Sequence, residues 1–337
     1  MIDLQLLHRA LDALPDPVTG RGLVAAGRAA PPTAQGPVAR ATIDVTGLSD
    51  EARTALEGAA RAALAAVPGV GEVRLLLTAE RVGRTLLAVA SGKGGVGKST
   101  VSANLAVALA RMGVSVGLID ADIYGPSQPR LLGTEGEKPT ADKQRMNPVM
   151  SRFGVPMLSM GMLVPPGQAI AWRGPMAGNA LGQLVDADWG ATRLLILDLP
   201  PGTGDVQLTM VQKHKPGAAL IVSTPQDLAL IDATRAIDLF RKATVPVLGL
   251  VENMAGYACP HCGEISDPFG RGGAEAAAAT MDLPFLGRVP LEIAIRTASD
   301  AGEPPAAQDG PVGAPFHALA AKVAAAMNLT AAGGLNA

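Results

Sequence analysis

The sequence is poor in aromatic residues and lacks a marked excess of either charge. Aromatic side chains make up 3% of its 337 residues, so a surface that stacks nucleic-acid bases is not expected. The 28 basic and 30 acidic residues give a net charge of −2, which provides no electrostatic reason to expect nucleic acid or an anionic membrane as the main partner. We therefore expect no nucleic acid and no membrane among its main partners.

Long apolar runs and a secretory leader are also missing. No uncharged apolar run reaches the roughly 18 residues of a spanning helix. The first residues do not pair a basic stretch with an apolar one, as a secretory signal would. The chain has two cysteines, Cys259 and Cys262, which are too few for a disulfide framework. These absences favour a cytoplasmic protein.

What the chain does have is enough apolar sequence for a sizeable core. Hydrophobic residues make up 48% of it, and the length allows two domains or one large one. We predict a small α/β domain over residues 1–80, a linker over 81–85, a larger domain over 86–327 and a disordered tail over 328–337. In the small domain we expect two helices, the second capped by Ser49, and strands over 38–45 and 73–77.

The larger domain is predicted to be α/β, with a doubly wound and mostly parallel sheet. Strand and helix patterns alternate through it, which favours right-handed crossovers and helices on both faces. Ligands of such sheets bind at the carboxyl ends of the strands. Residues 133–156 are rich in turn formers and charge, so we expect a mobile surface loop there. The predicted strands are at 86–90, 114–119, 194–198, 219–223, 247–251 and 285–288, and the predicted helices at 101–112, 228–243 and 315–327.

A glycine-rich loop follows the first of these strands. Gly92 to Ser99 matches the phosphate-loop pattern G-x-x-x-x-G-K-[ST] between a strand and a helix. Glycines let successive N–H groups curl around a phosphate, and the helix N-terminus adds partial positive charge. Lys98 is expected to reach the β- and γ-phosphates of ATP, and Ser99 to ligate Mg²⁺. The nucleotide-binding residues are predicted to be Gly92, Lys93, Gly94, Gly95, Val96, Gly97, Lys98, Ser99 and Thr100.

Three polar groups follow later strands. Asp120 and Asp122 end one strand, where carboxylates can position water and support Mg²⁺ hydration or simply cap the next element. Asp198 ends the apolar run 194–197, as a Walker B carboxylate that completes the Mg²⁺ shell does. Asn253 follows another strand, where its amide can pair with an adenine edge or cap a turn.

The two cysteines are two residues apart, in Cys259-Pro260-His261-Cys262-Gly263. Two thiolates at this spacing can grip one zinc or one cluster iron, or they can act as a redox dithiol. The residues after Gly263 do not resemble a helix start, which a redox dithiol favours. A four-thiolate site needs two chains, so a homodimer could hold one [4Fe–4S] cluster or one zinc on its axis.

Several of these segments resemble a known family. Lys93 to Thr100 reads K-G-G-V-G-K-S-T and is similar to the K-G-G-x-G-K-[ST] loop of the deviant Walker A ATPases, which include MinD, ParA and the nitrogenase iron protein. The strings 120–127 and 198–205 resemble those of the Mrp/ApbC branch of iron–sulfur cluster carriers. The stretch 64–70 is similar to the small domain that precedes the ATPase in that branch.

The resemblance implies a specific function. It implies an ATP-sandwiched homodimer in which Lys93 crosses to the partner's nucleotide, Asp122 orients the attacking water and Asn253 meets adenine. It favours a [4Fe–4S] cluster at Cys259 and Cys262, with apo iron–sulfur proteins as clients and iron–sulfur scaffold proteins as further partners. The alternatives are a MinD/ParA-like positioning ATPase and an ATP-dependent iron–sulfur reductase.

Overall fold

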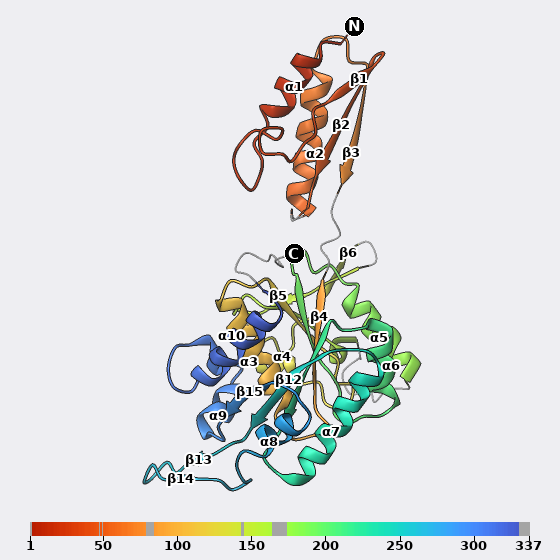
Figure 1. The fold of residues 1–337 in the computed structure, drawn as a ribbon. Helices are drawn as coiled ribbons and strands as arrows, with labels where there is room; N and C mark the ends of the chain where they lie inside the picture. Colours follow the sequence, from red (N-terminus) through yellow and green to blue (C-terminus); the bar gives the residue numbers. More distant parts are fainter. Residues whose placement is uncertain are drawn as a thin grey trace. The chain divides into compact units, whose positions relative to one another are not determined.

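The chain forms two compact units, Met1–Gly83 and Arg84–Ala337 (Figure 1). The computed structural model describes residues 2–46, 48, 50–78, 84–142, 145–163 and 174–329. The predicted helix cap Ser49, most of the predicted linker and the tail from Thr330 lie outside the described residues.

The first unit is a three-stranded sheet with two helices. Strand β2 lies between β1, its antiparallel neighbour, and β3, its parallel neighbour. Alternate residues of β2 are buried, as the alternating pattern predicted, and they pack against Leu7 of α1 and Leu64 of α2. The prediction of a small α/β domain is confirmed. Its elements are α1 (Leu4–Asp12), β1 (Thr33–Gln35), β2 (Val38–Asp44), α2 (Asp50–Ala65) and β3 (Glu72–Thr78).

The second unit is built on an eight-stranded sheet with the order β15-β12-β11-β4-β10-β5-β9-β8. All neighbouring pairs are parallel except β8 and β9. Every residue of β5, β10 and β11 is buried, which explains why these strands are continuous apolar runs. The strands are β4 (Thr85–Ala90), β5 (Val116–Asp120), β8 (Val149–Met150), β9 (Pro156–Ser159), β10 (Leu194–Asp198), β11 (Ala218–Ser223), β12 (Val247–Asn253) and β15 (Phe285–Val289).

Helices cover both faces of this sheet, so the doubly wound fold class is confirmed. One face packs on α3 (Lys98–Arg111) and α10 (Ala314–Ala326), and the other on α5 (Gly174–Val185), α6 (Asp205–His214) and α7 (Asp227–Lys242) (Figure 1). Of the helices described here, none is both long and apolar enough to cross a bilayer. The remaining elements are α4 (Gln128–Leu131), η1 (Met160–Leu163), α8 (Gly273–Thr280), α9 (Ile293–Asp300) and η2 (Pro305–Ala307).

The prediction of a mobile surface loop over 133–156 is wrong. This segment contains a hairpin of β6 (Thr140–Asp142) and β7 (Arg145–Asn147), and it supplies β8 and the start of β9 at the edge of the main sheet. Val149 and Val155 are buried in the core. A second hairpin, β13 (Tyr257–Ala258) with β14 (Ile265–Ser266), projects from the unit and carries both cysteines (Figure 1).

Candidate functional site

The predicted polar residues gather at the carboxyl edge of the main sheet. Strand β10 lies between β4 and β5, and its last residue, Asp198, is in register with Asp120 of β5. The loop after β4 leads into α3, so the N-terminus of that helix opens at the same edge. The structure thus brings Lys98, Asp120 and Asp198 together, from segments about 20 to 100 residues apart in the sequence.

The glycine loop has the conformation and the space that only glycine permits at two positions. Gly97, which precedes α3, has a φ of 78° and lies so close to Asn253 that a Cβ would meet its Nδ2 at 2.1 Å. A Cβ on Gly92 would meet the main-chain carbonyl of Asp232 in α7 at 2.1 Å. At these two positions the loop approaches α7 and β12 so closely that only glycine fits.

Lys98 is the first residue of α3, and its ammonium group is buried beside two oxygen atoms that can accept hydrogen bonds. Its Nζ lies 2.6 Å from Asp198 Oδ1 and 3.4 Å from Ser99 Oγ. Lys98 is 6% exposed and Asp198 is fully buried, so this is a buried ion pair. The phosphate-loop lysine, the hydroxyl and the Walker B carboxylate predicted from the sequence therefore meet at one point.

Asp198 is held by two further donors. Ser102 Oγ donates to Asp198 Oδ1 at 2.9 Å, and Gln128 Nε2 donates to Oδ2 at 2.8 Å. Gln128 Nε2 also donates to the Ser99 main-chain carbonyl at 3.0 Å. Sequence reasoning missed both residues. The position of Ser102, one helical turn after Lys98, could have indicated it, but no pattern points to Gln128.

Asp120 is fully buried and anchors the loop that follows it. Its Oδ2 accepts hydrogen bonds from the main-chain N–H groups of Ser127 and Gln128 and from Ser159 Oγ. Burial, followed by the nearby charge of Asp198, raises the pKa of Asp120 to about 7. Asp120 is therefore a structural carboxyl that ties β5 to the start of α4.

Asp122 lies next to this anchor and is nearly buried, at 8% exposure. Its Oδ1 accepts from the main-chain N–H groups of Tyr124 and Gly125 at 3.0 and 3.3 Å. These bonds form the local turn that aspartate commonly makes. They fix the carboxylate at the same edge of the sheet as Lys98.

Lys93 and Asn253 differ in burial. Lys93 Nζ is exposed, 3.5 Å from Gln226 Oε1. Asn253 is 6% exposed, and its Nδ2 donates to the Val96 carbonyl at 2.8 Å. The preceding residue, Glu252, was not predicted. It is fully buried, pairs with Arg288 at 2.9 Å and accepts from the main-chain N–H of Ala274.

These residues fit a nucleotide with its magnesium ion. The loop offers main-chain N–H groups and the N-terminus of α3 for phosphate. The Ser99 hydroxyl and the Asp198 carboxylate are hard oxygen ligands of the kind that Mg²⁺ prefers. Gln128 Oε1 is buried without a hydrogen-bond partner in the described part of the chain, as an acceptor awaiting a ligand would be.

The cysteines lie in the turn of the β13–β14 hairpin. The Cys259 N–H donates to Glu264 O, and the Gly263 N–H donates to Cys259 O, which closes the turn. The N–H groups of Cys262 and His261 donate to the Cys259 sulfur and lower the pKa of its thiol. Across the described ranges, no three His, Cys, Asp or Glu side chains are arranged to hold a metal ion. Within the described residues, the hairpin therefore offers two thiols as possible metal ligands.

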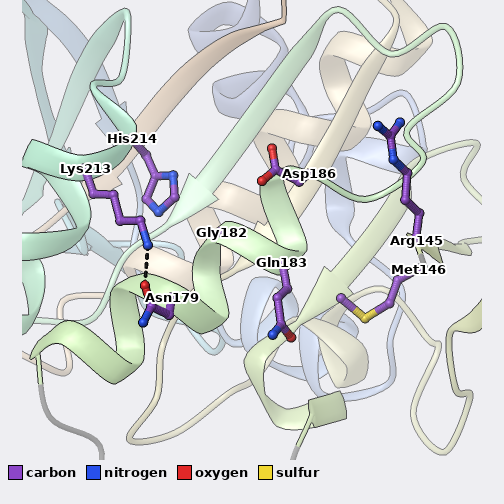
Figure 2. Close-up of a pocket in the computed structure, with 8 residues that line it drawn as sticks. All are labelled: Arg145, Met146, Asn179, Gly182, Gln183, Asp186, Lys213 and His214. Atoms are coloured by element: carbon purple, nitrogen blue, oxygen red, sulfur yellow. Dashed lines mark hydrogen bonds between the residues drawn. The ribbon is translucent and has the colours of Figure 1, made fainter.

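Figure 2 shows a separate pocket of about 650 Å³ on the α5–α6 face. Lys213 Nζ donates to Asn179 Oδ1 at 2.5 Å across its wall, and burial lowers the pKa of His214. None of the predicted site residues lines it. Its lining residues are Arg145, Met146, Asn179, Gly182, Gln183, Asp186, Lys213 and His214.

Comparison with known proteins agrees with this geometry. The model of the family described as ParA: NUBPL iron-transfer P-loop NTPase matches residues 83–324. An iron-sulfur cluster carrier protein of Deinococcus radiodurans is 45% identical over 308 residues, which are 88% of this chain and 87% of that protein.

Two solved structures are similar to the second unit. A nucleotide-binding protein of Archaeoglobus fulgidus in complex with ADP is 39% identical, has a TM-score of 0.61 and matches over 70% of this chain and 93% of that one. The cell division ATPase MinD of Pyrococcus furiosus is 25% identical, has a TM-score of 0.54 and matches over 72% of this chain and 98% of that one. The chain therefore belongs to the ParA/NUBPL family of iron-transfer P-loop NTPases.

Proposed function

We propose that this protein is an ATPase that carries a [4Fe–4S] cluster between two copies of the chain and transfers it to apo-proteins. The observation that carries the proposal is the cysteine hairpin. It presents two thiols in a turn whose N–H groups point at sulfur, on the same unit as a complete phosphate loop. Two thiols are half of a four-thiolate site, so a second copy is the natural source of the other half.

The nucleotide half of the function uses residues of the phosphate loop and its neighbours. The N–H groups from Gly92 to Thr100 would hold the phosphates, and Lys98 would neutralise their charge. Bound Mg²⁺ would supply further charge neutralisation, with Ser99 and Asp198 as the residues that hold it. In the described structure the Lys98 ammonium already contacts Asp198 and Ser99, so it lies at the position where phosphate and metal would meet.

Three residues are assigned to steps around the γ-phosphate and the base. Asp122 would orient the attacking water, since its carboxylate is fixed by the turn at 124–125. Lys93 would reach the nucleotide of the second copy, which its exposed ammonium permits. Asn253 would contact adenine while its Nδ2 keeps the phosphate loop in place through Val96.

The cluster itself is cargo. The N–H donors around Cys259 favour the thiolate form that binds iron. The name of the Deinococcus radiodurans relative, iron-sulfur cluster carrier protein, supports a cluster-carrying role. Apo-proteins are the proposed clients, and scaffold proteins are proposed as further partners. A cytoplasmic location stays a prediction of the sequence.

The test is anaerobic reconstitution of the full chain with iron and sulfide, followed by metal analysis, sizing and absorption spectroscopy. We expect about four irons and four sulfides per dimer and a brown colour. One zinc per dimer without colour would instead indicate a structural site, and a reversible intrachain disulfide without metal would indicate redox chemistry. Transfer is then measured as activity regained by an apo [4Fe–4S] enzyme, which separates a carrier from a reductase.

The contact of Lys93 with the second copy has its own test. Lys93→Ala should slow ATP hydrolysis. In a mixture of Lys93→Ala and Lys98→Ala chains, each mixed dimer keeps one site that has both lysines, so the mixture should hydrolyse ATP faster than either variant by itself. If Lys93→Ala hydrolyses ATP at the unmodified rate, the shared site is wrong.

A further inference from the structure

Gln128 is a buried polar residue that the proposed function does not use. It is the first residue of the short helix α4, has no exposed surface and lies at the carboxyl edge of the sheet. Its main-chain N–H donates to Asp120 Oδ2 at 3.0 Å. Both its main chain and its side chain are therefore engaged with the carboxylates of β5 and β10.

The side-chain amide of Gln128 has a defined orientation. Its Nε2 lies 3.0 Å from the Ser99 carbonyl and 2.8 Å from Asp198 Oδ2, and both partners are acceptors. Only the NH₂ end of an amide can satisfy two acceptors, so the carbonyl end, Oε1, is fixed as well. One side chain thus joins the first turn of α3 to the end of β10.

The bonds to Asp198 leave a specific opening. Its Oδ1 accepts hydrogen bonds from Lys98 and Ser102, whereas Gln128 is the one donor to its Oδ2 among the residues that the structure describes. A carboxylate oxygen accepts about two hydrogen bonds, so Oδ2 keeps one free position. Gln128 contributes to where that position faces, because together with Lys98 and Ser102 it holds the carboxylate against rotation.

The other end of the amide is the second, independent observation. Gln128 Oε1 is buried and has no donor among the residues that the structure describes. A buried acceptor without a partner is unfavourable, and native proteins seldom keep one without a ligand or a water. The waters around a magnesium ion are donors of the matching kind.

We propose that Gln128 is a positioning residue for the magnesium ion of the nucleotide. Its Nε2 sets the direction of the Asp198 carboxylate, and its Oε1 accepts a hydrogen bond from a water that the ion carries. The inference rests on the proposed nucleotide site. It adds a residue from the loop after Asp120 to the metal environment, so that metal binding and the position of α4 depend on each other.

The experiment measures binding of fluorescently labelled ADP to the full chain, first in excess EDTA and then during a Mg²⁺ titration. Gln128→Met keeps the length of the side chain and removes both amide atoms. We expect its ADP affinity in EDTA to stay within about twofold, and its Mg²⁺ concentration at half-saturation to rise about tenfold, the usual effect of losing an outer partner of a metal ligand. Gln128→Leu, which fills the space differently, should show the same shift.

Gln207→Met is the matched control. Gln207 is 2% exposed, and its two amide atoms have no partner within the described residues, so it reports the loss of a buried amide elsewhere. Its Mg²⁺ titration should be that of the unmodified chain. In an Asp198→Asn background, Gln128→Met should add less than about twofold, because the two residues act through one carboxylate.

Three results would overturn the inference. They are an unchanged Mg²⁺ titration in both Gln128 variants, an equal loss of ADP affinity with and without Mg²⁺, and full additivity with Asp198→Asn. If the unmodified chain binds no ADP at all, the proposed function fails first, and that result is distinct from the other three.

Discussion

The nucleotide site and the cysteine hairpin belong to one unit but are built in opposite ways. Lys98 is 6% exposed, and Asp120, Gln128 and Asp198 are fully buried in a network of hydrogen bonds. In the hairpin, Cys262 is exposed and the neighbouring Ile265 is 69% exposed. The residues around Lys98 form a buried network within one chain, whereas the hairpin presents its two thiols near the surface.

The difference predicts how each region responds to change. A buried charge that loses its partner is costly, so substitutions at the nucleotide site should affect stability together with function. Surface substitutions usually change stability by less than about 0.5 kcal/mol, so substitutions in the hairpin should affect cargo alone. Four experiments test this contrast.

The largest effect is expected for Lys98→Ala. Losing the phosphate-facing ammonium should lower the rate of ATP hydrolysis by at least about 10²–10³-fold. It also leaves the buried Asp198 carboxylate unpaired, at about 3–5 kcal/mol of unfolding free energy. Phosphate release and urea unfolding measure the two losses. Iron loading of the folded variant should be unchanged, and a loss of iron would break the contrast.

The second largest effect is expected for the two cysteine variants, which should lose iron but keep stability and nucleotide binding. They are Cys259→Ser and Cys262→Ser. Each is expected to lose nearly all cluster iron, because one thiolate of the pair cannot retain it. Urea unfolding and ADP binding should match those of the unmodified chain. Full iron content after anaerobic reconstitution of either variant would rule out the proposed ligands.

The next effect concerns pH and Asp120. Its pKa is raised from 3.8 to about 7 in the folded chain, first by burial and then by Asp198. A raised pKa means that the folded state holds a proton that the unfolded state has released, so this contribution is full below about pH 4 and is lost as pH rises towards 7. Against Asp120→Asn, the nucleotide-free unmodified chain should lose a few kcal/mol of unfolding free energy over this range. Parallel stability curves from pH 4 to 7 would contradict it.

The smallest effect compares a glycine from each region. Gly97 and Gly263 have φ values of 78° and 74°, so alanine at either position costs about 1–2 kcal/mol of backbone strain. A Cβ at Gly97 would also meet Asn253 Nδ2 at 2.1 Å. A Cβ at Gly263 would have no atom of the described residues within 4 Å. Gly97→Ala should therefore be the less stable variant and the one that binds ADP more weakly. Equal unfolding midpoints would remove the distinction.

Much of the sheet could be predicted because its central strands are buried on both faces. Strands β10 and β11 are continuous apolar runs, and their observed ends agree with the predicted ones to within one residue. The edge formed by β9 and β8 could not be predicted. Strand β9 has four residues and pairs with β5, whose last residue lies 36 positions before the first of β9. A strand of four residues is too short to show a periodic pattern of hydrophobic residues, and its neighbour in the sheet is determined by tertiary packing.

The candidate site divides in the same way. The sequence indicates Lys98 and Ser99 because their chemistry depends on a fixed local spacing, and Asp198 because it ends a continuous apolar run. It does not indicate Gln128, whose neighbours Ser127 and Pro129 favour a turn and whose partners are 29 and 70 residues away. Such a residue is recognised only when the fold has brought its acceptors together.

The hydrogen bond between Asn253 and Val96 also connects the nucleotide site with the segment that leads to the cysteine hairpin. Asn253 ends β12 and holds the phosphate loop through the Val96 carbonyl, and six residues later the same chain reaches Cys259. Hydrogen bonds from Ala255 to Val289 and from Leu291 to Gly256 fix the segment between them to the end of β15. The thiols therefore lie in a short hairpin, and the strand end that leads into it is hydrogen-bonded to the loop that would bind the phosphates.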